Sequence, residues 1–165
     1  MIPHAVEILL VEDDPVDLKL ALRELEREGT VRVEVVRDGE EALDFLFCRG
    51  GFEDRSPLSP PAMVLLDLKL PKVDGLEVLH EIKSNPATQA IPVVILTSSR
   101  EERDLIESYR LGVNSYIQKP VDFGKFRDTM RTVESYWMSL NQRPPHKAYA
   151  PRESSADEIP DPAKS

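Results

Sequence analysis

Short runs of apolar residues alternate along the chain with segments in which apolar residues recur every three or four positions. The apolar runs have the length of β-strands and lie at residues 6–11, 31–36, 62–67, 92–97 and 115–119. The first, third and fourth runs are apolar at nearly every position, which is typical of strands covered on both faces of a sheet. We therefore predict five strands in a sheet with helices on both sides.

The segments between the runs have the period of α-helices. In the first segment, four apolar residues from Leu18 to Leu25 share one helical face, and Gly29 follows as a stop for the helix. The same pattern predicts helices over residues 15–28, 39–48, 75–84, 102–111 and 122–141. Alternating strand and helix units predict an α/β fold, a flavodoxin-like doubly wound five-stranded parallel sheet with right-handed crossovers.

Two stretches follow neither pattern. Residues 49–61 contain two glycines and three prolines, and such a loop is either a functional surface or an inert insertion. From Arg143 onward the chain has five prolines and few apolar residues, a composition that does not build a core of its own. We expect one domain over residues 5–141 and a Pro-rich tail over 142–165 that is flexible or contacts a partner.

Composition and charge exclude some classes of function. Of the 165 residues, 41% are hydrophobic, which suffices for one core, and the formal net charge of −9 disfavours a nucleic-acid groove. No apolar run is long enough to span a membrane and no leader precedes the domain, so we expect a cytoplasmic protein without membrane contact. The single cysteine, Cys48, lies in an apolar run and is predicted to be a small buried hydrophobe rather than a reactive thiol.

Polar residues gather where the predicted strands end. They are Glu12 and Asp13 after the first strand, Asp67 at the end of the third, Thr97 at the end of the fourth, and Tyr116 and Lys119 on the fifth. Because the carboxyl ends of parallel strands meet at one edge of a sheet, three carboxylates, a hydroxyl and an ammonium converge there. Neighbouring carboxylates repel one another unless a cation offsets them, so this edge is predicted to bind one.

Clustered carboxylates suit a hard divalent cation such as Mg²⁺. A carboxylate beside this metal can attack phosphorus and become an aspartyl-phosphate, while the metal and a lysine neutralise the phosphoryl oxygens and a threonine donates a hydrogen bond. Taken singly, Asp14 could cap the first helix and Lys119 could be a surface lysine. The joint arrangement favours a site for phosphoryl transfer.

Four motifs lie at these strand ends: "VEDD" at 11–14, "LLDLKLPKVDG" at 65–75, "ILTSS" at 95–99 and "YIQKP" at 116–120. With them the chain resembles the receiver domains of two-component response regulators over about residues 5–141. The resemblance implies a protein that accepts a phosphoryl group from a sensor histidine kinase. By this resemblance the protein is not an enzyme that acts on other molecules. It is a phosphoacceptor that assists its own Mg²⁺-dependent phosphorylation and dephosphorylation.

The resemblance also assigns roles to residues, namely phosphoacceptor, metal ligands, phosphate-pairing lysine and switch pair. The phosphoacceptor is Asp67, and the metal ligands are Glu12, Asp13, Asp67 and the backbone carbonyl of Lys69. The phosphate-pairing lysine is Lys119, and the switch pair is Thr97 and Tyr116. A cis peptide bond before Pro120 is expected. On phosphorylation the Thr97 hydroxyl would move inward and Tyr116 would fill the space left, which carries the signal to the surface of helix 102–111.

A closer match is to the single-domain response regulators that are paired with cyanobacterial and bacterial phytochromes. Its signs are the long loop 49–61, "EIKSNP" at 81–86 and the aromatic "ESYW" at 134–137. That subfamily has no output domain. The resemblance therefore implies a phytochrome kinase as the input and an interaction as the output.

Other classes fit less well. A haloacid-dehalogenase-like phosphatase or a toprim-like nuclease needs a second Asp two residues after the first, where this chain has Lys69 after Asp67. A flavodoxin would place a phosphate-binding loop after the first strand, where this chain has acids that repel phosphate. The alternative that stays open is a binding module with a receiver fold that works without phosphorylation.

The apolar pattern of the last predicted helix indicates self-association. Apolar residues hold heptad spacing from Phe123 to Leu140, about 27 Å at 1.5 Å per residue, which is longer than the side of the sheet to be covered. The final turns, with Tyr136, Trp137 and Leu140, would then leave apolar surface in water, which usually marks an interface. We expect a homodimer through the 102–141 face, with the segment after Arg143 reaching the partner, or alternatively a tail that folds back over these residues.

Overall fold

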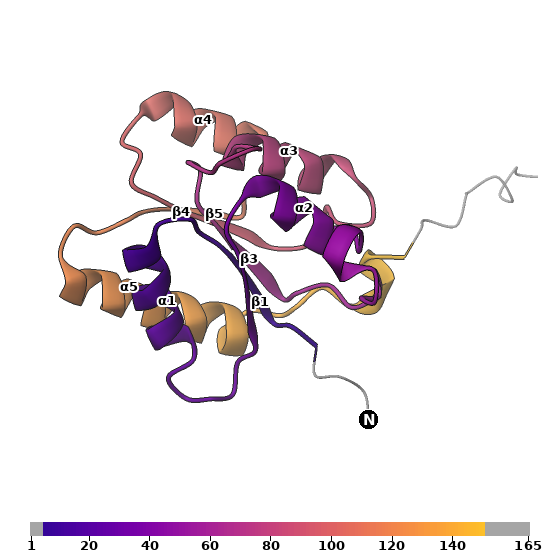
Figure 1. The fold of residues 1–165 in the computed structure, drawn as a ribbon, viewed down its shortest axis with the longest axis horizontal. Coiled ribbons are helices and arrows are strands. Elements are labelled where there is room, and N and C mark those ends of the chain that lie inside the picture. Colours follow the sequence, from indigo (N-terminus) through magenta and orange to yellow (C-terminus); the bar gives the residue numbers. More distant parts are fainter. Residues whose placement is uncertain (1–4, 151–165) are drawn as a thin grey trace, which may run out of the picture.

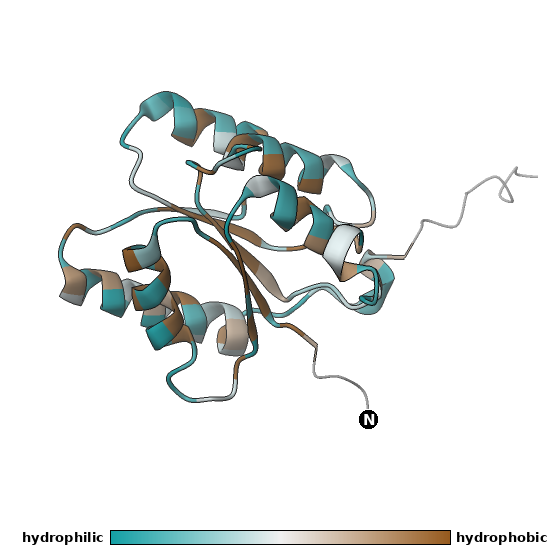
Figure 2. Ribbon diagram, viewed as in Figure 1, coloured by the Kyte–Doolittle hydropathy of each residue, from teal (hydrophilic) through white to brown (hydrophobic). Residues whose placement is uncertain are grey.

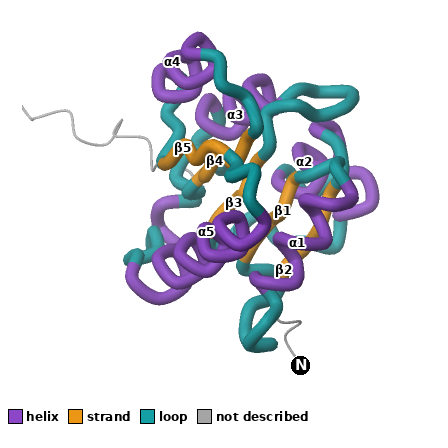
Figure 3. Tube along the Cα trace, turned by 90° about the vertical axis from the view of Figure 1, so that its left-hand side faces the viewer, coloured by secondary structure: helices purple, strands orange, loops and turns teal. Residues whose placement is uncertain are grey.

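The computed structural model describes residues 5–150 and contains one sheet of five parallel strands in the order β2-β1-β3-β4-β5. The strands are β1 (Ile8–Val11), β2 (Val33–Val36), β3 (Met63–Leu66), β4 (Val93–Thr97) and β5 (Ser115–Gln118). Each lies inside an apolar run of the sequence, and Figure 3 shows them side by side in this order. The order places β1, β3 and β4 inside the sheet, which is why these three are buried at every position and apolar at every position except Thr97 at the end of β4.

Five helices connect and cover the strands. They are α1 (Pro15–Leu25), α2 (Gly39–Leu46), α3 (Gly75–Ser84), α4 (Glu102–Arg110) and α5 (Phe123–Ser135). Each lies within its predicted segment, although α1 ends three residues early and is followed by a turn in which Gly29 has a φ of +66°. After α5 the chain continues through one π-helical turn at Tyr136–Leu140. The predicted α/β fold class, a doubly wound parallel sheet, is confirmed.

The core has two layers, one on each face of the sheet. Helices α1 and α5 cover one face, and α2, α3 and α4 cover the other (Figure 1). Figure 2 shows the hydrophobic strands between helices whose outer faces are hydrophilic. Large apolar side chains such as Met130 on the first face and Phe45 on the second are almost completely buried. No helix in residues 5–150 has the length and apolar character that crossing a membrane requires.

The loop 49–61 is held by the side chain of Arg55. Its guanidinium donates to the carbonyls of Phe45 and Ser59 and lies 3.6 Å from the centre of the Phe45 ring. Cys48 precedes this loop and is only partly buried, so the prediction of a buried cysteine is wrong. The reason is local, because α2 ends at Leu46 and Cys48 lies in the following turn with a φ of +55°.

The first residues of the predicted tail pack against the domain itself. Arg143 forms an ion pair with Glu7 at 3.2 Å, and the ring of His146 lies 3.0 Å from the carbonyl oxygen of Leu58. Tyr149 is only 7% exposed and belongs to the core cluster on the side of α2 and α3. The predicted tail 142–165 is therefore divided, since residues 143–149 lie on their own domain and residues 151–165 lie outside the described part of the chain.

The end of the last helix is less exposed than its pattern predicts. Trp137 is half-buried against the core cluster of α1 and α5, and its ring packs edge to face on Tyr136 with centroids 5.0 Å apart. Tyr136 and Leu140 remain exposed, at 46% and 70%. Trp137 lies in the π-helical turn that follows α5 and packs on the core from there.

Candidate functional site

The carboxyl ends of four strands bring the predicted site residues to one edge of the sheet. Glu12 follows β1, Asp67 follows β3, Thr97 ends β4 and Lys119 follows β5. The backbone N–H of Lys119 donates to the carbonyl of Thr97 at 2.7 Å, so it continues the pairing of β4 with β5. All four residues are buried, as expected for groups held at the mouth of a covered sheet.

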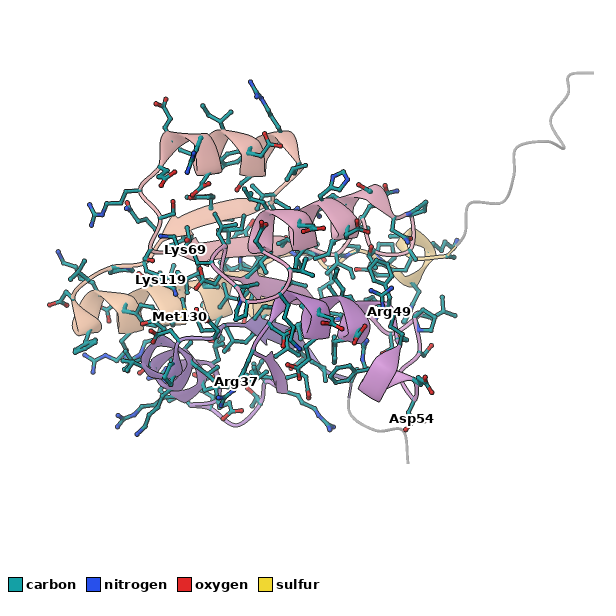
Figure 4. All side chains as sticks on the ribbon, turned by 45° about the horizontal axis from the view of Figure 1, so that its top comes forward. Arg37, Arg49, Asp54, Lys69, Lys119 and Met130 are labelled. Atoms are coloured by element: carbon teal, nitrogen blue, oxygen red, sulfur yellow. The ribbon has the colours of Figure 1, made fainter. Side chains whose placement is uncertain are left out.

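Figure 4 labels Lys69 and Lys119 at one end of the molecule and Arg49 and Asp54 at the other. The loop 49–61 is therefore far from the site. It contributes no group to the chemistry at the strand ends, and the two alternatives of a functional surface and an inert insertion both stand.

Lys119 is the centre of an ion-pair network. Its ammonium donates to Oε2 of Glu12 at 2.8 Å, to Oδ2 of Asp17 at 2.9 Å and to Oδ2 of Asp67 at 3.0 Å. An ammonium has three N–H donors, so these bonds use all of them. Lys119 is therefore the cation that offsets the clustered acids.

The charges in this network shift the pKa values of its members. Burial, followed by the neighbouring Asp67 carboxylate, raises the pKa of Glu12 from 4.5 to about 7, although Lys119 acts in the opposite direction. Burial alone would lower the pKa of the Lys119 ammonium. Its hydrogen bonds to Glu12 and Asp17 and the charge of Asp67 outweigh burial and raise that pKa above the ordinary value. One lysine does not fully offset the acids, so the site favours a further cation.

Three carboxylates can bind that cation. One oxygen from each of Glu12, Asp13 and Asp67 lies within 4.8 Å of the others, and Asp13 is exposed whereas the other two are buried. The backbone N–H of Lys69 donates to Oδ1 of Asp67 at 3.3 Å, so the loop after β3 folds around the acid. An oxygen-only set that is open to solvent on one side suits a hard divalent cation that keeps several waters.

Thr97 and Tyr116 lie on neighbouring strands, as predicted. Thr97 is fully buried, and its hydroxyl accepts a hydrogen bond from the backbone N–H of Ser99 at 3.1 Å. The Ser99 hydroxyl in turn donates to Asp104 in the first turn of α4. The Tyr116 hydroxyl is buried and makes no hydrogen bond of normal geometry within residues 5–150. Burial and then the Asp104 carboxylate raise its pKa, whereas the nearby Ser99 side chain acts in the opposite direction. An unsatisfied buried hydroxyl is unfavourable, so a state in which it gains a hydrogen bond would be favoured by that contact.

Local sequence explains how the helices begin at this edge. Asp14 caps α1, because its side chain accepts from the backbone N–H groups of Val16 and Asp17, each at 2.9 Å. At Gly75, which begins α3, an added Cβ would lie 2.3 Å from the carbonyl oxygen of Asp67, so only glycine allows this close approach. The alternative role of Asp14 as a helix cap is thus confirmed.

One expectation at this edge is wrong, and some contacts were not foreseen. The peptide bond before Pro120 is trans, since residues 5–150 contain no cis peptide bond, and trans is the lower-energy form in the absence of a constraint. The contacts of Asp17 with Lys119 and of Ser99 with Asp104 were not predicted. The position of Asp17 three residues after a helix cap was the one available signal, because it places the acid in the first turn, at the same edge as the strand ends.

The site combines a buried carboxylate, a lysine ammonium beside it and further acids that could hold a metal ion. Asp67 offers a carboxylate oxygen, Lys119 lies next to it, and the hydroxyl of Thr97 ends the adjacent strand. Carboxylate, lysine and hydroxyl are the groups that accept and hold a phosphoryl group when a divalent cation shares the site.

Comparison with known proteins extends this description. Residues 8–131 match the family model of the response regulator receiver domain. The probable methanogenesis regulatory protein FilR2 of Methanothrix harundinacea is 46% identical over 138 residues, which are 83% of this chain and 86% of FilR2. Response regulator Rcp1 of Synechocystis is 44% identical over 133 residues, 79% of this chain and 88% of Rcp1. A crystal structure of Rcp1 is that of its Mn²⁺-bound form.

Solved structures agree with the sequence relatives. The phosphorylated cyanobacterial phytochrome response regulator RcpA superposes with a TM-score of 0.80 at 40% identity, over 87% of this chain and 100% of RcpA. The bacteriophytochrome response regulator RtBRR has a TM-score of 0.67 at 49% identity, over 88% of this chain and 89% of RtBRR. The similarity spans nearly the whole of each of these proteins.

Proposed function

The chain belongs to the response regulator receiver domain family, and on that basis we propose that it accepts a phosphoryl group on Asp67 from a sensor histidine kinase and signals by changing its conformation and association. Proteins of this family are in general signalling proteins rather than enzymes. The observation that carries the proposal is the set of contacts around Asp67, a buried carboxylate with a lysine ammonium at 3.0 Å and two further acids beside it.

The chemical step is a displacement at phosphorus. An Asp67 carboxylate oxygen forms the new O–P bond, and the P–N bond to the imidazole of the kinase phosphohistidine breaks. The electron pair of that bond returns to the imidazole nitrogen. Lys119 remains beside the phosphoryl oxygens, and Thr97 donates its hydroxyl hydrogen to one of them.

The cation of this site is Mg²⁺, bound by Glu12, Asp13, Asp67 and the backbone carbonyl of Lys69. When bound, Mg²⁺ neutralises charge on the phosphoryl oxygens. The acidic cluster supports this assignment, because burial and Asp67 raise the pKa of Glu12 and an added cation relieves that repulsion. Rcp1, a relative of this chain, has a Mn²⁺-bound form, and Mn²⁺ also prefers oxygen ligands.

The kinase is a phytochrome kinase in this proposal. RcpA and RtBRR, by their names, are response regulators of phytochromes from cyanobacteria and other bacteria, and they match this chain over most of its length. FilR2, by its name a methanogenesis regulatory protein, has a similar sequence, so the identity of the kinase needs its own test. Purified phytochrome kinases that label this protein much faster than an unrelated histidine kinase would support the pairing, and equal slow labelling by both would refute it.

The switch acts through Thr97 and Tyr116. A phosphoryl group on Asp67 draws the Thr97 hydroxyl away from the backbone N–H of Ser99, and Ser99 is tied to Asp104 in α4. Tyr116 moves inward and its unpaired hydroxyl gains a partner. Crystals grown with and without beryllofluoride test this mechanism, and an identical Tyr116 rotamer in both contradicts it.

Self-association uses the face made by α4, β5 and α5. β5 is an edge strand, and the segments that flank it carry exposed apolar side chains. They are Ile106 and Tyr109 on α4, and Phe123, Tyr136 and Leu140 in and after α5. Trp137 contributes to this face indirectly, because its ring packs against that of the exposed Tyr136. The occupant is a second copy of the chain in a symmetric pair.

Sedimentation tests the dimer. The double variant Tyr136→Ser, Leu140→Ser should lower the dimer fraction at tens of micromolar protein, whereas Val16→Ser, which removes an exposed valine from α1, should leave it unchanged. A wild-type protein that stays monomeric with and without beryllofluoride would rule out the pair.

Phosphorylation itself is tested with acetyl phosphate and Mg²⁺, followed by intact-mass measurement. We expect a gain of one phosphoryl group that requires Mg²⁺, is sensitive to hydroxylamine and is absent in Asp67→Asn. Lys119→Ala should still bind metal but should switch poorly, because the metal is held by carboxylates. If neither acetyl phosphate nor a kinase labels Asp67, the alternative of a binding module that works without phosphorylation holds instead.

A further inference from the structure

The three acids around Lys119 are not equivalent. Glu12 and Asp67 belong to the acidic cluster, and their side chains are 4% and 7% exposed. Asp17 does not belong to it, and its side chain is 30% exposed. Lys119, which Figure 4 labels, is itself buried, and all three acids meet at its ammonium.

The start of α1 determines where Asp17 lies. Asp14 accepts a hydrogen bond from the Asp17 backbone N–H, which fixes Asp17 in the first helical turn. From there its carboxylate reaches the ammonium of Lys119 at 2.9 Å, although Lys119 follows the strand at the far edge of the sheet. The contact therefore ties α1 to the segment after β5.

A cation in the acidic cluster competes with Lys119 for two of its three partners. Lys119 now occupies one oxygen of Glu12 and one oxygen of Asp67, and a cation bound by these acids draws on the same two carboxylates. A buried ammonium that loses its partners is unfavourable. Asp17 is the one partner of Lys119 that the cation leaves unchanged.

We propose that Asp17 is a positioning residue that holds the Lys119 ammonium beside the acidic cluster while a divalent cation and then a phosphoryl group engage Glu12 and Asp67. This rests on the proposed function, in which Asp67 accepts the phosphoryl group. Asp17 continues to accept a hydrogen bond from one N–H of Lys119. The other two N–H groups can then exchange their hydrogen bonds to the carboxylates for hydrogen bonds to phosphoryl oxygens. The cation then enters without leaving a buried ammonium unpaired.

The test is Mg²⁺ binding by the unphosphorylated protein, measured by calorimetry for the wild type and Asp17→Asn. We expect Asp17→Asn to weaken Mg²⁺ binding by about 2- to 5-fold, the upper part of the range for one partly exposed ion pair. The matched control is Glu77→Gln, because Glu77 has the same position in α3, with its backbone N–H bonded to the cap Asp74, and does not contact Lys119. This control should change the affinity by less than about twofold.

A double-mutant cycle separates contact with Lys119 from simple loss of charge. In a Lys119→Gln background, Asp17→Asn should change Mg²⁺ affinity by at most about twofold. An equal factor in both backgrounds would show that Asp17 acts only through its charge, and wild-type affinity in Asp17→Asn would likewise overturn the proposal. Asp17→Glu, which restores the carboxylate, should recover at least part of the affinity.

A spectroscopic measurement tests the position of the ammonium directly. In ¹⁵N-labelled protein saturated with Mg²⁺, the Lys119 NH₃⁺ group should give a protected NMR signal in the wild type and in Glu77→Gln. The signal should be lost in Asp17→Asn, and its persistence there would contradict the proposal. Neither measurement involves phosphorylation, so a protein that is never phosphorylated still gives a clear answer on Asp17.

Discussion

Truncating Tyr149 to alanine tests whether the segment after Arg143 is part of the folded domain. Tyr149 is only 7% exposed and packs in the core cluster on the side of α2 and α3, although its neighbour Lys147 is exposed. Burying a tyrosine removes on the order of 150–200 Å² from water, which at about 25 cal/mol per Å² is roughly 4–5 kcal/mol.

The measured loss should be smaller than that upper value. Unfolded chains already bury part of their apolar surface, and a segment at the end of a domain can detach without unfolding the rest. We therefore expect Tyr149→Ala to lower the free energy of unfolding by about 2–4 kcal/mol, which for a domain of this size lowers Tm by roughly 6–12 °C.

The assay is urea unfolding followed by the fluorescence of the single tryptophan, Trp137, which is half-buried on the opposite face of the sheet. Lys147→Ala is the control and should change the free energy of unfolding by less than about 0.5 kcal/mol. Tyr149→Phe should be nearly neutral at pH 7, because burial of the ring rather than the hydroxyl carries the effect. If Tyr149→Ala has the urea midpoint of the wild type, the segment contributes nothing to the fold and the reasoning is refuted.

Three further predictions concern the site and its supports. Burial and Asp67 raise the pKa of Glu12 from 4.5 to about 7. Between pH 4.5 and pH 7 the unfolded chain therefore binds fewer protons than the folded one. The metal-free protein should lose stability as the pH rises through this window. Gly75→Ala should lower the free energy of unfolding by about 1–3 kcal/mol and impair phosphorylation, because its Cβ would lie 2.3 Å from the carbonyl oxygen of Asp67. Thr88→Val should cost about 1–2 kcal/mol, because the buried Thr88 hydroxyl donates to the Ile82 carbonyl at 2.7 Å.

Each of these has a matched control. Urea unfolding in EDTA from pH 5 to pH 8 should show a shallower pH dependence in Glu12→Gln, and an unchanged slope would assign the effect to other groups. Gly51→Ala places a Cβ where nothing lies within 4 Å, and thermal unfolding should show it to be nearly neutral. Thr88→Ser keeps the hydroxyl and should retain most of the stability that Thr88→Val loses, so equal losses in both would count against the hydrogen bond.

The strand and helix pattern was readable from the sequence, and so were the site residues at the strand ends. Apolar periodicity reports which face of an element is buried, a local property, and parallel strands must bring their carboxyl ends together. The sequence alone therefore predicts Glu12, Asp67, Thr97 and Lys119 at one edge, and the structure brings them together there.

The tertiary structure alone decided which groups meet across that framework. Asp17 reads as an ordinary acid in a first helical turn, and only the packing of α1 beside the end of β5 makes it the third partner of Lys119. Tyr149 lies in a Pro-rich segment with no apolar period, so nothing local indicates that it returns to the core. The apolar pattern places Trp137 at an exposed helix end, yet in the structure it packs half-buried on the core cluster. Sequence periodicity describes one element at a time, whereas these contacts join residues far apart in the chain and depend on how the finished elements pack.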